Sequence, residues 1–224
     1  NNNFDLIIHF AAIVPISKVN KKYKHALDVN YIGTRNLIKM IIKHKLNLKW
    51  FFYSSTSHVY SYSTKKIKEN YQLKPITKYG KTKLMAENLI TKKLNNTKIK
   101  FCIGRIFSII DNKNKEFFLK GLINKIQNNN KIVKLDNLNH YRDFISTDQI
   151  SKAILLLWSK KHQGIINIAN GKKTNLKTIA QVFAKKCEKK IFFNKNKQTS
   201  MIANINKLKK YGWKNNNLNF IKFF

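Results

Sequence analysis

The sequence is poor in acidic residues, cysteine and proline. Ten Asp and Glu stand against 45 Lys and Arg in 224 residues, which gives a formal charge of +35. The two cysteines, Cys102 and Cys187, are isolated and lack metal-ligand spacing, which excludes a disulfide scaffold and predicts reduced thiols. No apolar run reaches the roughly 18 residues of a membrane span, and the N-terminal residues show no signal-peptide pattern. We therefore expect a soluble, cytoplasmic protein that enters no membrane.

What the sequence has in excess is lysine. The 42 Lys, 30 Asn and 30 Ile fill 102 of 224 positions, and only three residues are arginines. An AT-rich coding sequence produces this skew, because the codons of these residues contain little G or C. Selection for a polyanionic partner would instead cluster the basic residues and favour Arg. Because the lysines are spread over the whole chain, we favour drift and do not expect nucleic acid as a partner.

The first half of the chain alternates short apolar runs with segments of helical period. The runs predict strands buried on both faces of a parallel sheet, and the periodic segments predict helices. The predicted strands are residues 6–11, 50–54 and 99–107, and the predicted helices are residues 23–45 and 79–94. This alternation predicts an α/β protein with a Rossmann-like, doubly wound parallel sheet.

The second half is less regular and predicts a small lobe carried after the main sheet. Its pattern indicates strands at residues 131–135 and 164–170 and helices at residues 147–158 and 175–186. Apolar residues make up 43% of the chain, which is enough for a core and argues against a disordered basic tail.

The pattern that most suggests chemistry is Tyr79-Gly-Lys-Thr-Lys83, at the start of a predicted helix. A spacing of four residues places both side chains on one helix face, where an ammonium can lower the pKa of the phenol. Spacing alone proves little, because Tyr62 and Lys66 share it. Upstream, Ser54-Ser-Thr56 places hydroxyls at the carboxyl edge of the sheet, where open α/β folds bind ligands. The alternative is that these hydroxyls only end a strand and that Tyr79 lies on the surface.

Several short motifs follow one another along nearly the whole chain. They are Asp5-Leu-Ile-Ile-His-Phe-Ala-Ala12, Asn30-Tyr-Ile-Gly-Thr34, Ser54-Ser-Thr-Ser-His-Val-Tyr60, Glu69 with Pro75 and Tyr79-Gly-Lys-Thr-Lys83, Arg105-Ile-Phe107, Tyr141-Arg-Asp-Phe-Ile145 and Gly164-Ile-Ile-Asn-Ile-Ala-Asn-Gly171. In order and spacing they resemble the extended short-chain dehydrogenase/reductase family of nucleotide-sugar epimerases and dehydratases. The region of Tyr79 is most similar to the UDP-galactose 4-epimerase branch. The resemblance implies NAD as cofactor, with NADP as the alternative, and a nucleotide sugar as substrate; it also allows a homodimer.

The resemblance implies catalytic roles for three residues. Tyr79 would be the acid/base, Lys83 would hold the nicotinamide ribose and lower the pKa of Tyr79, and Thr56 would hydrogen-bond the reacting sugar oxygen. Tyr79 would take the proton of the sugar C4 hydroxyl while hydride passes to the nicotinamide. This step would leave a 4-keto intermediate that is later reduced.

The resemblance also implies residues that bind cofactor and substrate. The residues implied to line the cofactor, besides Tyr79 and Lys83, are Phe10, Ala11, Ala12, Asn30 and Ser54. Arg142 would clamp the nucleotide diphosphate with its guanidinium, and Thr56 would also contact the sugar. The alternative for Arg142 is a structural salt bridge with Asp143 or Asp148. No metal site is expected.

Three departures from the family pattern matter. No Gly-x-x-Gly-x-x-Gly stretch occurs among the seven glycines, so we expect an N-terminally truncated chain that lacks roughly 60 residues and the phosphate-binding turn. Ser57 and His58 follow Thr56 where dehydratase branches place acidic residues, which favours an epimerase or a keto-sugar reductase. Ser108 stands where many relatives have an Asn that touches substrate, which blurs the substrate assignment.

The expected organisation follows from these features. Residues 1–108 would form a partial NAD(P)-binding Rossmann domain, and residues 109–224 mainly a substrate-binding lobe, with residues 147–170 returning to the sheet. The expected function is an NAD(P)-dependent nucleotide-sugar epimerase that acts at C4. The alternatives are an NADPH-dependent 4-keto-sugar-nucleotide reductase and, from another class, a basic nucleic-acid-binding protein or an inactive fragment that reuses the fold.

Because the phosphate-binding turn is absent from this sequence, we predict that the 224-residue chain binds NAD weakly or not at all. Titration with NAD, followed by calorimetry, checks this prediction. Tight binding would show that other residues of the chain replace the glycine-rich turn.

Overall fold

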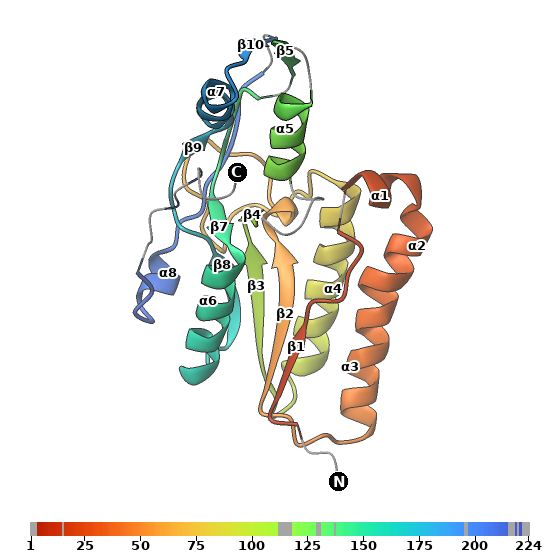
Figure 1. Cartoon of the computed structure of the whole chain (residues 1–224). Coiled ribbons are helices and arrows are strands. Elements are labelled where there is room, and N and C mark those ends of the chain that lie inside the picture. The colour runs from red at the N-terminus through yellow and green to blue at the C-terminus, as the bar shows by residue number, and fades with distance from the viewer. Residues whose placement is uncertain are drawn as a thin grey trace.

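The computed structural model describes residues 4–14, 16–111, 118–128, 131–136, 138–194, 197–214, 218 and 220. Its centre is a four-stranded sheet in the order β1-β2-β3-β8, in which every neighbouring pair is parallel (Figure 1). The strands are β1 (Leu6–His9), β2 (Trp50–Thr56), β3 (Lys100–Ile106) and β8 (Gly164–Ile168). The predicted α/β class and parallel sheet are confirmed.

Helices cover the sheet on both faces (Figure 1). On one side lie α1 (Ile16–Lys21), α2 (Tyr23–Leu27), α3 (Thr34–Lys43) and α4 (Lys78–Leu94). On the other lie α6 (Thr147–Ser159) and α8 (Asn206–Lys209). A π-helical segment, η1 (Asp28–Gly33), joins α2 to α3 without a break in helical backbone, so the helix predicted at residues 23–45 is one stretch with a wider middle turn. A 3-10 turn, η2 (Ser57–Val59), follows β2.

The remaining elements form small sheets beyond the carboxyl ends of the central strands (Figure 1). β5 (Ile132–Leu135) pairs with β10 (Lys190–Phe193), β4 (Ser108–Ile110) pairs with β7 (Phe144–Ser146), and β6 (His140–Arg142) lies between β9 (Thr174–Asn175) and β11 (Thr199–Met201). The helices α5 (Phe118–Gln127) and α7 (Leu176–Lys186) pack beside them. Meanwhile β8 pairs with β3 in the central sheet. A division of the chain into two domains near residue 108 remains our proposal.

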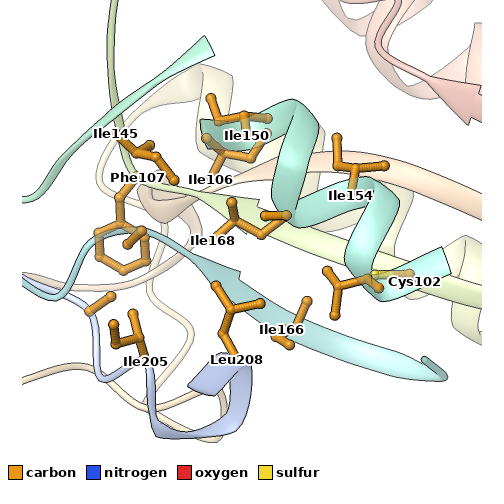
Figure 2. Close-up of a cluster of buried hydrophobic side chains, with 14 of the residues drawn as sticks. Cys102, Ile106, Phe107, Ile145, Ile150, Ile154, Ile166, Ile168, Ile205 and Leu208 are labelled. Carbon is orange, nitrogen blue, oxygen red and sulfur yellow. The ribbon is translucent and has the colours of Figure 1, made fainter. Parts of the chain in front are cut away.

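An apolar cluster fills the space between the sheet and α6 (Figure 2). Cys102 and Ile106 of β3 and Ile168 of β8 contact side chains of α6 such as Ile154. A second cluster on the opposite face packs β2 and β3 against α3 and α4. Each fully buried aliphatic side chain contributes roughly 1.5–3 kcal/mol through its removal from water. Among the described residues, no helix is both long and apolar enough to cross a bilayer.

One buried carboxylate ties three segments together. Asp143, between β6 and β7, is fully buried and accepts the backbone N–H groups of Asn170 at 3.0 Å, Gly171 at 2.9 Å and Ala203 at 3.1 Å. These donors follow β8 and β11, so the carboxylate connects the end of the central sheet to the chain that leads to α8. Backbone donors buried in this way need an acceptor, because an unpaired one costs roughly 1–3 kcal/mol.

We predict that Asp143→Asn lowers the free energy of unfolding by about 3 kcal/mol, because an amide NH2 would face buried N–H donors. Urea denaturation measures the loss. Asp148→Asn is the matched control: its carboxylate pairs with Lys152 in the open, with 67% and 63% of the side chains exposed, and such pairs contribute less than about 1 kcal/mol. Equal losses in the two variants would contradict the role given to Asp143.

Candidate functional site

Helix α4 and strand β2 bring three predicted residues together. Thr56 ends β2 and is buried, and its side chain lies close enough to the phenol of Tyr79, in the first turn of α4, to affect its pKa. Lys83 lies one turn further along α4 and is 1% exposed. The arrangement excludes the reading of Tyr79 as a surface residue, since only 9% of it is exposed. It places a hydroxyl, a phenol and an amine at the carboxyl end of the sheet.

The distance between β2 and α4 depends on Gly80. A Cβ atom at this position would lie 2.2 Å from the backbone oxygen of His58 in η2, closer than any side chain can approach. Thr77 caps the helix at the same place, because its side chain accepts the N–H of Gly80 at 2.9 Å. The missing side chain therefore lets the first turn of α4 press against the turn that follows Thr56.

Burial shifts the pKa values of the two titratable residues in opposite directions. It raises the pKa of Tyr79 above its usual value of 10, and the nearby side chain of Thr56 only partly opposes this. It lowers the pKa of Lys83 to about 7, against the attraction of Glu87. The expected lowering of the Tyr79 pKa by Lys83 is therefore not found in the chain alone. The physical reason is that desolvation outweighs the effect of an ammonium that is itself only partly charged at neutral pH.

A buried ion pair joins α4 to β3. Arg105 of β3 and Glu87 of α4 are 1% and 2% exposed, and their Nη2 and Oε2 atoms lie 2.7 Å apart. Ser55 also donates to Glu87, and Arg105 donates to the hydroxyl of Tyr60 at 2.8 Å and to the backbone oxygen of Glu69 at 2.9 Å. The network satisfies the polar atoms of a pair that the apolar surroundings would otherwise penalise.

Asn30 lies near the site, as expected, but its amide is already occupied. It is fully buried in η1, accepts the N–H of Ile13 at 2.7 Å, and donates to the Ile13 oxygen and to Thr82 Oγ1, both at 3.1 Å. Both amide hydrogens are therefore used within the protein. The structure gives Asn30 the role of joining the segment after β1 to α4 and leaves it no donor for a direct contact with a ligand.

The other predicted cofactor residues are accessible. Phe10 and Ala11 are exposed, and Ala12 and Ser54 are partly exposed. Phe10, Ala11 and Ala12 follow the carboxyl end of β1, next to β2, so all four lie at the edge of the sheet where Thr56 ends β2. The Phe10 ring packs on Phe52, with ring centroids 5.9 Å apart.

Arg142 approaches the site from β6. Its guanidinium donates to the Tyr141 oxygen at 2.9 Å and to Thr199 Oγ1 at 3.2 Å, and lies 5.4 Å from the centre of the Tyr62 ring. Its charge also contributes, after burial, to lowering the pKa of His58 to about 4. Arg142 therefore lies close to the turn that follows Thr56.

The alternative of a structural salt bridge for Arg142 is wrong within the part of the chain that the structure describes. Asp143 is held by backbone N–H groups, and Asp148 pairs with Lys152 at 2.8 Å. Neither forms an ion pair with Arg142.

Residues 1–169 match the model of the NAD dependent epimerase/dehydratase family. The chain belongs to this family. It is 26% identical over 183 residues to a putative UDP-glucose 4-epimerase of Methanocaldococcus jannaschii, a match that covers 80% of this chain and 59% of the relative. It is 28% identical over 170 residues to the GDP-6-deoxy-D-talose 4-dehydrogenase of Aggregatibacter actinomycetemcomitans, which covers 75% of this chain and 56% of the relative. The chain thus spans less than three fifths of the length of these two relatives.

A solved structure of the same fold is the UDP-glucuronic acid 4-epimerase of Bacillus cereus in complex with UDP-glucuronic acid and NAD. It has a TM-score of 0.87 at 22% identity, over 98% of this chain and 73% of the epimerase. At this identity the likeness establishes the fold alone.

Sequence reasoning missed two residues that shape the site of this family member. One is Gly80, which lies within the Tyr79 motif: a glycine in the first turn of a helix lowers helix stability and so signals a close approach. Glu87 continues the four-residue spacing of Tyr79 and Lys83, which was a signal for a shared buried face. Neither contact could be measured without the positions of η2 and β3.

We predict that Gly80→Ala destabilises the protein by at least about 2 kcal/mol, because the new methyl group overlaps backbone rather than a movable side chain. Thermal unfolding measures the change. Gly121→Ala in α5 is the matched control: nothing lies within 4 Å of its new Cβ atom, so better helix propensity should stabilise the protein by about 0.5–1 kcal/mol. A stabilised Gly80→Ala would disprove the close approach.

We also predict that Lys83→Met changes how stability depends on pH. The Lys83 pKa of about 7 lies below the roughly 10.4 of an unfolded lysine. Between these two pH values, the unfolded state therefore holds a proton on Lys83 that the folded state has lost. The contribution of Lys83 to the free energy of unfolding therefore rises from about pH 7 to about pH 10. This contribution is lost as the pH falls back to the folded-state pKa of about 7. Urea titrations across this range should give a flatter profile for Lys83→Met. Lys81→Met, on the exposed side of α4, should keep the wild-type slope; a parallel profile for Lys83→Met would contradict the shift.

Proposed function

We propose that the chain carries the acid–base and substrate-binding parts of an NAD-dependent nucleotide-sugar 4-epimerase, with NADP as the alternative cofactor. The observation that supports this most is the contact of Thr56 with Tyr79 at the end of β2, with Lys83 one turn further along α4. The names of the relatives support the same substrate class, because the match from M. jannaschii is a putative UDP-glucose 4-epimerase.

The donors at this position fit a nicotinamide dinucleotide. Among the described residues, the Lys83 ammonium has no hydrogen-bond partner or ion pair within reach, although it is 1% exposed. Such a group fits the hydroxyls of a ribose. Ala11 and Ala12 after β1 add small side chains beside which a flat ring can lie. When bound, the nicotinamide supplies the hydride acceptor for oxidation of the sugar carbon and the donor for its reduction.

The chain's own residues would handle the proton. Thr56 and Tyr79 would both contact the C4 oxygen of the sugar, and Tyr79 would remove its proton as the carbon becomes a ketone. A charged Lys83 close to Tyr79 would stabilise the phenolate form that accepts this proton. Because burial raises the pKa of Tyr79, its phenolate is a strong base that takes the proton readily, and the phenol so formed would return it to the oxygen when the 4-keto sugar is reduced from the other face.

Arg142 would hold the substrate by its diphosphate. A guanidinium has five N–H donors in a planar fork that suits phosphate oxygens, and the structure uses Nη1 for its contacts with Tyr141 and Thr199. These two contacts fix the side chain near His58 and leave further donors for an anion.

A 4-keto-sugar reductase is the second candidate, favoured by the 28% identity to a GDP-6-deoxy-D-talose 4-dehydrogenase. The two functions differ in their net reaction, because an epimerase regenerates its cofactor and a reductase consumes it. Supplying a 4-keto nucleotide sugar with NADH or NADPH, and following the cofactor absorbance, separates them. Stoichiometric consumption favours the reductase.

We predict that Tyr79→Phe in the full-length protein lowers turnover by about 10²–10⁴-fold, the usual contribution of a positioned acid/base, and leaves the thermal midpoint nearly unchanged. Steady-state assays with UDP-glucose and UDP-galactose measure the effect. Tyr62→Phe is the control, because Tyr62 has the same spacing to a lysine but is 44% exposed. Near-normal turnover of Tyr79→Phe would disprove the assignment.

A further inference from the structure

Lys83 is a buried cation, and its charge needs a source of stabilisation. Tyr79, Lys83 and Glu87 follow one another at steps of four residues and form a polar stripe on the face of α4 that packs toward β2. An unpaired ammonium in such surroundings loses its proton, unless nearby groups offset the loss of hydration. The groups on this face that can stabilise the ammonium are Glu87 and the ring of Tyr53.

Glu87 offsets the charge only in part. Its Oε2 atom lies 2.7 Å from Arg105 Nη2, and its Oε1 atom accepts from Arg105 Nε at 3.1 Å and from Ser55. The carboxylate is thus matched by the guanidinium of Arg105, and the pair together carries no net charge. A neutral pair attracts a neighbouring ammonium much less than a free carboxylate does.

Tyr53 provides the closest π face. The Lys83 Nζ atom lies 4.1 Å from the centre of the Tyr53 ring, well inside the roughly 6 Å over which a cation is attracted by an aromatic ring. Tyr53 is fully buried in β2, and the ring of His9 packs nearby at 5.7 Å, which limits the movement of the phenol ring. The interaction is stronger where water is excluded, as it is here.

The hydroxyl of Tyr53 does not explain why a tyrosine is at this position. It lies beside Thr34 but lacks the geometry of a hydrogen bond to any described residue, and burial raises its pKa well above 10. A buried hydroxyl without a partner costs stability. The ring, rather than the hydroxyl, therefore makes the useful contact.

The other titratable groups that face Lys83 do not supply a counter-charge. His9 of β1 has its pKa lowered to about 4 by burial and by Lys83 itself, so it is neutral at pH 7. Tyr79 of α4 is protonated at this pH, because burial raises its pKa. The ring of Tyr53 and the partly neutralised Glu87 remain.

We propose that Tyr53 is a positioning residue for Lys83: its ring holds the amine against β2 and favours the charged form of Lys83 in the apolar interior. The contact itself stands on the geometry of the chain; its catalytic consequence rests on the proposed function. If the ring were electron-poor, Lys83 would become neutral, and the phenolate of Tyr79 would lose a nearby positive charge.

The test varies the electron density on the face of the ring at position 53 and keeps the six-membered ring itself. Tyr53→Phe keeps the ring and removes the unpartnered hydroxyl, and 4-fluoro- and 3,4,5-trifluorophenylalanine at the same position weaken the attraction stepwise. The measured quantity is the number of protons taken up on unfolding at pH 7, obtained from the slope of the unfolding free energy against pH. Each protein is compared with its own Lys83→Met version, which removes the contribution of all other groups.

With a Lys83 pKa of about 7, the tyrosine and phenylalanine proteins should take up about half a proton at this position. The trifluorinated ring should lower the pKa by about one unit, a tenfold loss of proton affinity, and bring the uptake close to one proton. An uptake that stays the same along the series would overturn the proposal. Because this measurement needs neither cofactor nor substrate, it does not depend on the proposed function.

Activity of the full-length protein provides the second measurement. The alkaline limb of the kcat/KM profile should move to lower pH as fluorine is added, whereas a merely structural defect would lower activity equally at every pH. A shifted proton uptake with an unshifted limb would confirm the contact of Tyr53 with Lys83 and refute its catalytic consequence. An unshifted uptake would refute the contact itself.

Discussion

The ion pair between Glu87 and Arg105 is the constraint on which the rest of the site depends. It joins α4 to the middle of the sheet. Replacing either partner by an uncharged residue would leave the other charge buried and unpaired, which typically costs about 3–5 kcal/mol. Such pairs add little net stability compared with apolar packing, but this one places Glu87 of α4 directly beside Arg105 of β3. The rotation of α4 that pairs Glu87 with Arg105 also turns Lys83 and Tyr79 toward β2.

Much of this architecture could be predicted from the sequence, because it depends on local patterns. Apolar runs and helical periodicity located β1, β2, β3 and β8 and the helices α2, α3, α4 and α6, but not α1 and α8. The same patterns placed Thr56 at the end of a strand and Tyr79 at the start of a helix, and the structure brings them into contact. The pairing of β5 with β10 and of β6 with β11 could not be predicted, since these strands lie about 60 residues apart and their order depends on the whole lobe.

The hydrogen bonds and pKa values of the site could not be predicted from the sequence, for a different reason. Asn30 was expected near the cofactor, but its amide is used by Ile13 and Thr82, and only three-dimensional proximity reveals this. The pKa of Tyr79 was expected to fall through a four-residue spacing, yet spacing carries no information about desolvation. Charges and hydrogen bonds act over a few ångströms, so a helix position known to one turn is too coarse to rank them.

The buried ionic groups in the described part of the chain are Lys83, Arg105, Glu87 and Asp143, two of each sign. The interior of the described part is therefore close to electrically balanced, and the excess of positive charge among the described residues lies on the outer surface. A molecule of this kind carries a dense atmosphere of mobile anions, and dilution of the buffer strengthens the mutual repulsion of its lysines. The same field draws small anions toward the protein from every direction, so their capture is fast in dilute salt and slows as ionic strength rises.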